Sequence, residues 1–172
     1  MADKKADAAK SNQLSKQISN QLSELDADSV QSDRRPSVEA PVNQCVHAFM
    51  SSPVRTVQAD AAMADAQAIL LRYGHTCLCV VDQREQLVGI LSRRDVDVAL
   101  RHGLQAAQVL TCMSAPVRVI ASHASLSEAH RLMVTYDIGR LPVIRSDQHL
   151  NGLVGIITRS DVLRQLQVIA PP

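Results

Sequence analysis

Residues 155–161 read Gly-Ile-Ile-Thr-Arg-Ser-Asp. An apolar strand end runs into a hydroxyl residue, Thr158, and the carboxylate of Asp161 follows three positions later. The same pattern occurs earlier, where residues 89–95 read Gly-Ile-Leu-Ser-Arg-Arg-Asp. One copy is typical of a strand that enters a helix capped by its own hydroxyl and carboxylate. Two copies, each near the end of a similar half of the chain, indicate a duplicated module with a duplicated site.

The duplication extends over most of the chain. Residues 50–55, Met-Ser-Ser-Pro-Val-Arg, align with residues 113–118, Met-Ser-Ala-Pro-Val-Arg. The second copy carries a short insertion at residues 146–151, after which the alignment resumes. Units of about 60 residues are small for a stable core of their own, so we expect the two units to pack on each other.

Each unit reads as strand, helix, strand, strand, helix. The first strands are expected at residues 56–57 and 119–120. The amphipathic helix that follows should turn one apolar face inward, including Tyr73 in the first unit and Tyr136 in the second. The apolar runs 77–81 and 141–144 are typical of strands covered on both faces. The last strands are expected at residues 87–91 and 153–157, and the last helices at Ser92 and Thr158.

The element order, the repeated Met-Ser-x-Pro-Val and the two Gly-h-h-Ser/Thr-x-x-Asp motifs (h apolar) resemble a tandem pair of CBS domains, the Bateman module. The resemblance implies an α+β fold of two β-α-β-β-α repeats, residues 45–104 and 105–168, packed about a pseudo-twofold axis. In this family the clefts between repeats bind adenosine-containing ligands. Two modules of the family commonly pair into a flat disk, so the resemblance implies a homodimer.

The second motif can hold a nucleotide through separate roles for its residues. Free N–H groups at a helix start attract a phosphate, to which Thr158 can add a hydrogen bond and Arg159 a charge. A phosphate would be repelled by Asp161, whose carboxylate suits ribose hydroxyls instead. For the base, the resemblance implies a pocket made by Val119, Ile120, Gly139, Arg140, Leu141 and Pro142.

The first motif supplies an equivalent site that differs in detail. Its residues are Ser92, Arg93 and Asp95, and the resemblance adds Val57, Thr76 and Cys77. Cys79 stands where the family usually has proline, and the pair Arg93-Arg94 favours a polyphosphate. We therefore expect the second site to be the principal one. For both motifs, a capping box with no role in ligand binding stays open as the alternative.

Composition excludes several classes of function. The net charge of the 172 residues is +1, so no strong field draws the chain to nucleic acid or an anionic membrane. The scarcity of aromatic residues, 2%, argues against a platform for base stacking. No apolar run approaches the roughly 20 residues of a membrane span, and the start lacks the apolar region of a signal peptide, so a cytoplasmic location is expected.

Catalytic and metal-binding patterns are also missing from the sequence. No nucleophile lies beside a base, and there is no P-loop or metal-ligand spacing, so the sequence predicts neither an enzyme nor a metal site. Four cysteines are present, and two of them, Cys77 and Cys79, lie inside an apolar run. We interpret this pair as small buried hydrophobic residues.

Residues 1–44 form a polar tail that is predicted to be mostly disordered. Four apolar residues, Leu14, Ile18, Leu22 and Leu25, share one face of a possible helix over residues 12–25. We expect a regulatory module that senses AMP, ADP or ATP, needs no obligatory cofactor, and signals to its own oligomeric state or to a protein partner. The alternative is a ligand-independent dimerisation scaffold whose tail recruits an enzyme or transporter.

Overall fold

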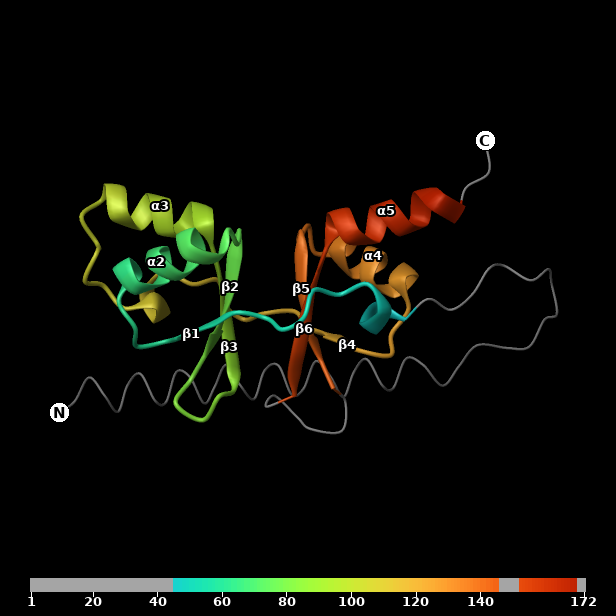
Figure 1. The fold of residues 1–172 in the computed structure, drawn as a ribbon, viewed down its shortest axis with the longest axis horizontal. Coiled ribbons are helices and arrows are strands. Elements are labelled where there is room, and N and C mark those ends of the chain that lie inside the picture. Colours follow the sequence, from blue (N-terminus) through green and yellow to red (C-terminus); the bar gives the residue numbers. More distant parts are fainter. Residues whose placement is uncertain (1–44, 146–151, 170–172) are drawn as a thin grey trace. The chain divides into compact units, whose positions relative to one another are not determined.

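The computed structural model describes residues 45–145 and 152–169. The predicted tail, with its possible helix over residues 12–25, and the insertion at residues 146–151 lie outside these ranges. The described chain divides into two compact units. Unit 1 runs from Val54 to Val117, and unit 2 combines residues 45–53 with the chain from Arg118 onward (Figure 1).

Unit 1 contains a three-stranded sheet in the order β1-β2-β3, in which β1 pairs parallel with β2 and β2 pairs antiparallel with β3. Its elements are β1 (Thr56–Gln58), α2 (Met63–Tyr73), β2 (Cys77–Val81), β3 (Leu87–Ser92), α3 (Arg93–Arg101) and the 3-10 helix η2 (Val109–Thr111). Helices α2 and α3 pack on one another beside the sheet (Figure 1). The core between them is apolar and includes Leu70, Leu78 and Leu91, each at most 1% exposed.

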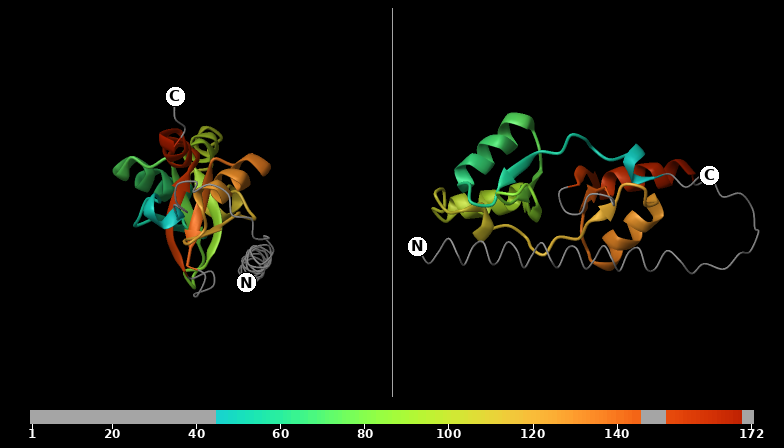
Figure 2. Two further views of the ribbon diagram at one scale, coloured as in Figure 1. Left: turned by 90° about the vertical axis from the view of Figure 1, so that its right-hand side faces the viewer. Right: turned by 90° about the horizontal axis from the view of Figure 1, so that it is seen from below.

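Unit 2 repeats this arrangement, with sheet order β4-β5-β6 and the same parallel and antiparallel pairings. Its elements are the 3-10 helix η1 (Val46–Ala48), β4 (Ile120–Ala121), α4 (Leu126–Thr135), β5 (Arg140–Ile144), β6 (Leu153–Thr158) and α5 (Arg159–Ile169). Figure 2 shows the two helices of each unit from two further sides. The predicted order of strand, helix, strand, strand, helix is therefore confirmed in both units.

The opening segment of each repeat completes the unit that consists mainly of the other repeat. Residues 45–53 open the first repeat but belong to unit 2. There, Ser51 N donates to Ile156 O at 2.8 Å and Ile156 N donates back to Ser51 O at 3.1 Å. In unit 1, Ser114 and Ile90 exchange the same pair of bonds, at 2.9 and 3.1 Å. The repeated Met-Ser-x-Pro stretch thus forms a short bridge to the last strand of a sheet.

Each bridge also explains the glycine of the duplicated motif. A Cβ atom built on Gly155 would lie 2.9 Å from Met50 Cγ and 3.0 Å from the Ser51 carbonyl oxygen. On Gly89, it would lie 2.9 Å from Met113 Cγ. A methionine therefore packs directly on the strand backbone in each unit, and a side chain at the glycine position would displace it.

Two tyrosines depart from the inward face predicted for the amphipathic helices. Tyr73 is 41% exposed and Tyr136 is 43% exposed. Each ring lies under a guanidinium group, with Arg55 Cζ 4.1 Å from the Tyr73 ring centroid and Arg118 Cζ 4.0 Å from that of Tyr136. The prediction was wrong because Tyr73 is the last residue of α2 and Tyr136 is the residue that follows α4, where the core ends and a cation can cover the ring.

Candidate functional site

Strand register brings two of the predicted site segments of each unit to one edge of its sheet. In unit 2, Arg140 at the start of β5 pairs with Thr158 at the end of β6. In the parallel pairing of β4 with β5, Ile120 is the partner of Val143, three residues further along β5 than Arg140. In unit 1, Cys77 pairs with Ser92 in the equivalent way. Each unit therefore brings the start of its second strand beside the hydroxyl residue of its motif, whereas Val57 and Ile120 pair three residues further along that strand.

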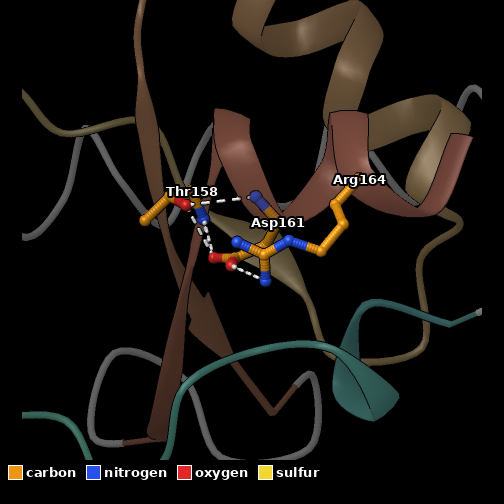
Figure 3. A network of polar contacts seen from close by, with 3 residues as sticks. All are labelled: Thr158, Asp161 and Arg164. Atoms are coloured by element: carbon orange, nitrogen blue, oxygen red, sulfur yellow. Dashed lines mark hydrogen bonds and ion pairs between the residues drawn. The ribbon is translucent and has the colours of Figure 1, made fainter. Parts of the chain in front are cut away.

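Thr158 and Asp161 form a reciprocal capping box at the start of α5 (Figure 3). The Thr158 N–H and hydroxyl both donate to Asp161 Oδ2, at 3.0 and 2.6 Å. In return, Asp161 N donates to Thr158 Oγ1 at 3.3 Å. The other carboxylate oxygen, Oδ1, lies 4.0 Å from Arg164 Nη1. The motif thus fixes the carboxylate through Oδ2 and leaves Oδ1 as the oxygen that could meet a ligand hydroxyl.

The helix start offers fewer N–H groups than the sequence suggested. Of the first-turn donors, Arg159 N donates to Gly139 O at 2.9 Å and Asp161 N is held by the Thr158 hydroxyl. A phosphate at this helix end would compete with these internal bonds for donors. The hydroxyl of Thr158 would have to turn away from Asp161 to donate to a phosphate oxygen.

The Arg159 side chain points to the turn before β5. Its Nη2 donates to the carbonyl oxygens of Met133 and Ile138, each at 3.1 Å, and lies 3.5 Å from Asp137 Oδ1. The Nε atom is buried and has no hydrogen-bond partner among the described residues. The side chain, 43% exposed overall, is therefore committed to the main chain of the α4–β5 turn. This geometry differs from the phosphate contact expected from the sequence.

The first motif has the same capping box. Ser92 N and Oγ donate to Asp95 Oδ2 at 3.0 and 2.6 Å, and Asp95 N donates to Ser92 Oγ at 3.2 Å. Arg93 N donates to Thr76 O at 2.9 Å, which matches the Arg159–Gly139 bond of unit 2. Unlike Arg159, the Arg93 side chain is exposed, and within the described residues it makes no ion pair.

Three of the predicted base-pocket side chains belong to the cores of their own units. Val57 is 5% exposed in unit 1, whereas Ile120 and Leu141 are fully buried in unit 2. Val119 and Pro142 are also buried. At this edge the main chain of residues 139–140 is less enclosed, since Gly139 is exposed and a Cβ placed on it would meet nothing within 4 Å.

Cys79 in unit 1 occupies the position that Pro142 occupies in unit 2. Cys79 is 0% exposed, as the sequence predicted for a small buried hydrophobic residue, and Cys77 is half-buried. Burial, with a smaller effect from nearby Cys77, raises the pKa of the Cys79 thiol to about 12. The Cys79 thiol is therefore protonated across the physiological pH range.

Sequence reasoning missed two residues that contact the second motif. Arg164 lies three positions after Asp161 on α5, a spacing that places two side chains on one helix face. Asp137 has φ 48°, a left-handed conformation that matches Gly74 (φ 65°) in unit 1. The tandem alignment of a glycine with an aspartate could have indicated a special backbone position there.

A metal site and a membrane-spanning helix are both absent from the described ranges. No group of three or more His, Cys, Asp or Glu side chains there is arranged to hold a metal ion. None of the helices in residues 45–145 and 152–169 has the length and apolarity needed to cross a membrane.

Comparison with known protein sequences gives two adjacent matches to the CBS domain family model, at residues 46–102 and 106–168. An A-adding tRNA nucleotidyltransferase of Geobacter sulfurreducens is 33% identical over 131 residues, which are 76% of this chain and 14% of that protein. An inosine-5'-monophosphate dehydrogenase of Korarchaeum cryptofilum is 31% identical over 134 residues, 75% of this chain and 27% of that enzyme. The chain therefore spans only 14% and 27% of the lengths of these two relatives.

Solved structures with the same fold include complexes with adenosine compounds. CBSX2 in complex with AMP superimposes with a TM-score of 0.61 at 29% identity, covering 73% of this chain and 98% of that one. A CBS domain of a membrane protein from Sphaerobacter thermophilus gives 0.60 at 26% identity, covering 70% and 86%. The CBS domain pair of MJ0100, with 5'-methylthioadenosine and S-adenosyl-L-methionine, gives 0.66 at 23% identity, covering 75% and 100% and supporting the fold alone.

Proposed function

The chain belongs to the CBS-domain family, as a tandem pair of repeats, and from this premise we propose that it is a regulatory module that binds an adenine nucleotide. The proposed ligand is AMP, ADP or ATP, and occupancy is passed to a protein partner or to the module's own oligomeric state. The module itself carries out no chemical step in this proposal. A homodimer, a cytoplasmic location and a partner bound through residues 1–44 are parts of the same proposal.

One observation carries the proposal. In unit 2, the carboxylate of Asp161 is fixed through one oxygen to Thr158, the last residue of β6, which pairs with Arg140 at the start of β5. A solved CBS-domain structure that is 29% identical to this chain is a complex with AMP. A fixed carboxylate oxygen beside exposed main chain is suited to a ligand that combines ribose hydroxyls with a polar base edge.

The proposed roles follow from the atoms that remain available. Asp161 Oδ1 accepts hydrogen bonds from the ribose hydroxyls, while Oδ2 stays in the capping box. Main-chain groups of Gly139 and Arg140 read the base edge, and buried Val119 and Pro142 limit the space beside it. The Thr158 hydroxyl turns from Asp161 to the phosphate. Ser92, Asp95 and Thr76 fill the matching roles in unit 1.

A thermal-shift panel tests the proposal. At a ligand concentration of about 100 times Kd, binding should stabilise the fold by about 2.7 kcal/mol, which raises Tm by several degrees for a chain of this size. The panel consists of adenosine, AMP, ADP, ATP, NAD and S-adenosylmethionine. If no compound raises Tm at millimolar concentration, the nucleotide-sensor function is wrong.

Substitutions of Asp161 test whether the ligand-induced rise in Tm depends on the second motif. Asp161→Asn keeps an oxygen for the capping box but loses the charge, and Asp161→Ala loses both. Each should reduce the ligand-induced shift, measured from the variant's own Tm. Asp97→Ala, which changes an exposed aspartate of α3 outside the motif, is the control and should shift as the natural sequence does.

A specific observation also favours the scaffold alternative. Both capping boxes are satisfied internally, so neither motif needs a ligand to complete its hydrogen bonds. Removal of residues 1–44 separates the two functions. A scaffold would lose its protein partner, keep its dimer and show no nucleotide dependence, whereas the sensor would retain its nucleotide-induced thermal shift.

A further inference from the structure

We propose that Arg159 is a positioning residue for base recognition in unit 2 and does not contact the phosphate. The effect on base recognition rests on the proposed nucleotide function. The role of Arg159 in holding the entry to β5 does not depend on a ligand. Arg159 would hold the entry to β5, residues 138–140, at the distance from α5 that the base requires. Its loss should therefore weaken binding through the base and not through the phosphate.

Two separate attachments join Arg159 to the entry to β5. The main-chain N–H donates to Gly139 O at 2.9 Å, and the guanidinium donates to Ile138 O at 3.1 Å. A third contact reaches Met133 O, near the end of α4, at 3.1 Å. Cations are favoured at the carbonyl end of a helix, so this third contact also stabilises the last turn of α4. One residue thus links the start of α5, the end of α4 and the start of β5.

Asp137 supports the same interpretation. Its carboxylate lies 3.5 Å from the Arg159 guanidinium, and its backbone adopts φ 48°. A non-glycine residue in this left-handed region carries a conformational cost, although aspartate tolerates it better than most residues. An ion pair whose carboxylate is 99% exposed stabilises little by itself. We infer that the pair serves to direct the guanidinium toward the two carbonyls.

In unit 1, the strand entry beside the motif lacks the contacts that Arg159 and Asp137 make in unit 2. Gly74 stands at the position of Asp137, with φ 65°, so no carboxylate is available there. Arg93 keeps the main-chain bond to Thr76 O at 2.9 Å, but its exposed side chain contacts no acceptor that the described residues provide. The two units therefore differ in how firmly the strand entry beside the motif is held, even though their capping boxes are equal.

The donors of Arg159 explain why a phosphate role is disfavoured. Its Nη2 is used by two carbonyls and a carboxylate, and releasing it would leave the Met133 and Ile138 carbonyl oxygens without this donor. The main chain that the guanidinium holds is the part of the site assigned to the edge of adenine. A change at residue 159 should therefore alter the preference among bases.

Amide hydrogen exchange in the full, ligand-free chain tests the structural part. The Ile138 N–H donates to Met133 O, one of the carbonyls that Arg159 contacts. In Arg159→Gln, exchange at Ile138 should accelerate about tenfold, the effect of losing a hydrogen bond of typical strength. The matched control is Arg131→Gln, which removes an exposed arginine of α4 and should leave exchange at Ile138 unchanged. Equal exchange in the two variants would overturn the proposal.

Calorimetric titration with adenosine, AMP, ATP and GMP tests the consequence. Arg159→Gln should weaken adenosine and AMP by the same factor, about tenfold, and should reduce the preference for AMP over GMP. Arg159→Lys should retain more of the affinity and more of the preference for AMP than Arg159→Gln does, because an ammonium group can still donate to a carbonyl. A loss that is absent for adenosine and grows from AMP to ATP would identify a phosphate contact and overturn the proposal. If the natural sequence binds none of these compounds, the proposed function fails, while hydrogen exchange still decides the role of Arg159.

Discussion

At the residue scale, the environment of Cys79 determines its chemistry. The thiol lies in β2 with none of its surface exposed, and its pKa is raised to about 12, mainly by burial and then by Cys77. Since the thiolate is the reactive form of cysteine, Cys79 should resist alkylation in the folded protein. Iodoacetamide at pH 8 followed by peptide mass spectrometry should find Cys79 modified only after denaturation. Equal labelling of Cys79 before and after denaturation would contradict this account of its burial.

The same pKa gives a pH dependence with a definite sign. Between the ordinary value of 9.0 and about 12, the unfolded chain has lost the Cys79 proton and the folded chain retains it. The contribution to stability is therefore complete below pH 9 and is lost as pH rises toward 12, by up to about 1.4 kcal/mol per pH unit. Denaturant unfolding at pH 8 to 11 should show a shallower fall for Cys79→Val than for the natural sequence. An identical slope in the two proteins would refute this assignment.

At the element scale, the stability of each unit should depend on the methionine that packs on the glycine of its last strand, Met50 on Gly155 and Met113 on Gly89. Gly155→Ala would place a methyl group against Met50 and 3.0 Å from the Ser51 carbonyl oxygen, so we expect a loss of about 1–3 kcal/mol of unfolding free energy. Gly139→Ala is the control, because a Cβ there meets nothing within 4 Å. Urea denaturation should separate the two variants. A Gly155→Ala protein as stable as Gly139→Ala would rule out close packing of Met50.

Most elements could be predicted from sequence because their signals are local. The apolar run 77–81 became β2 without a change of boundary, and the duplicated hydroxyl and aspartate became the caps of α3 and α5. The direction of the Arg159 side chain could not be predicted, since its acceptors are main-chain carbonyls more than 20 positions away. For Tyr73, helical periodicity gave the right face of α2 but could not reveal that the core ends one turn earlier.

At the scale of the whole molecule, the sequence order of the repeats differs from the composition of the units. Val46 belongs to the opening segment of the first repeat, yet its side chain is fully buried in the core of unit 2. Val109, near the start of the second repeat, is equally buried in unit 1. This exchange could not be predicted from sequence, because it depends on bonds such as Val46 N to Ala124 O, formed between residues far apart in the chain. The boundaries predicted at residues 45–104 and 105–168 remain a prediction about repeats, distinct from these packing units.

Because the opening segment of each repeat packs in the unit of the other repeat, a substitution in that segment should destabilise the unit in which it packs. Val46→Ala should cost about 2 kcal/mol and accelerate amide exchange in β5 and β6, and Val109→Ala should do the same in β2 and β3. Each variant serves as the control for the other. If Val46→Ala instead loosened β2 and β3, the assignment of residues 45–53 to unit 2 would be wrong.

We propose that an adenine nucleotide binds beside Asp161, where β5 begins and β6 ends. Titration of AMP into the isotope-labelled chain, followed by amide chemical shifts, measures this most directly. A nucleotide bound there should produce saturable shifts at residues 139–141 and 158–161 in the natural sequence and much weaker ones in Asp161→Asn. An unchanged spectrum at both segments with millimolar AMP, ADP and ATP would contradict it.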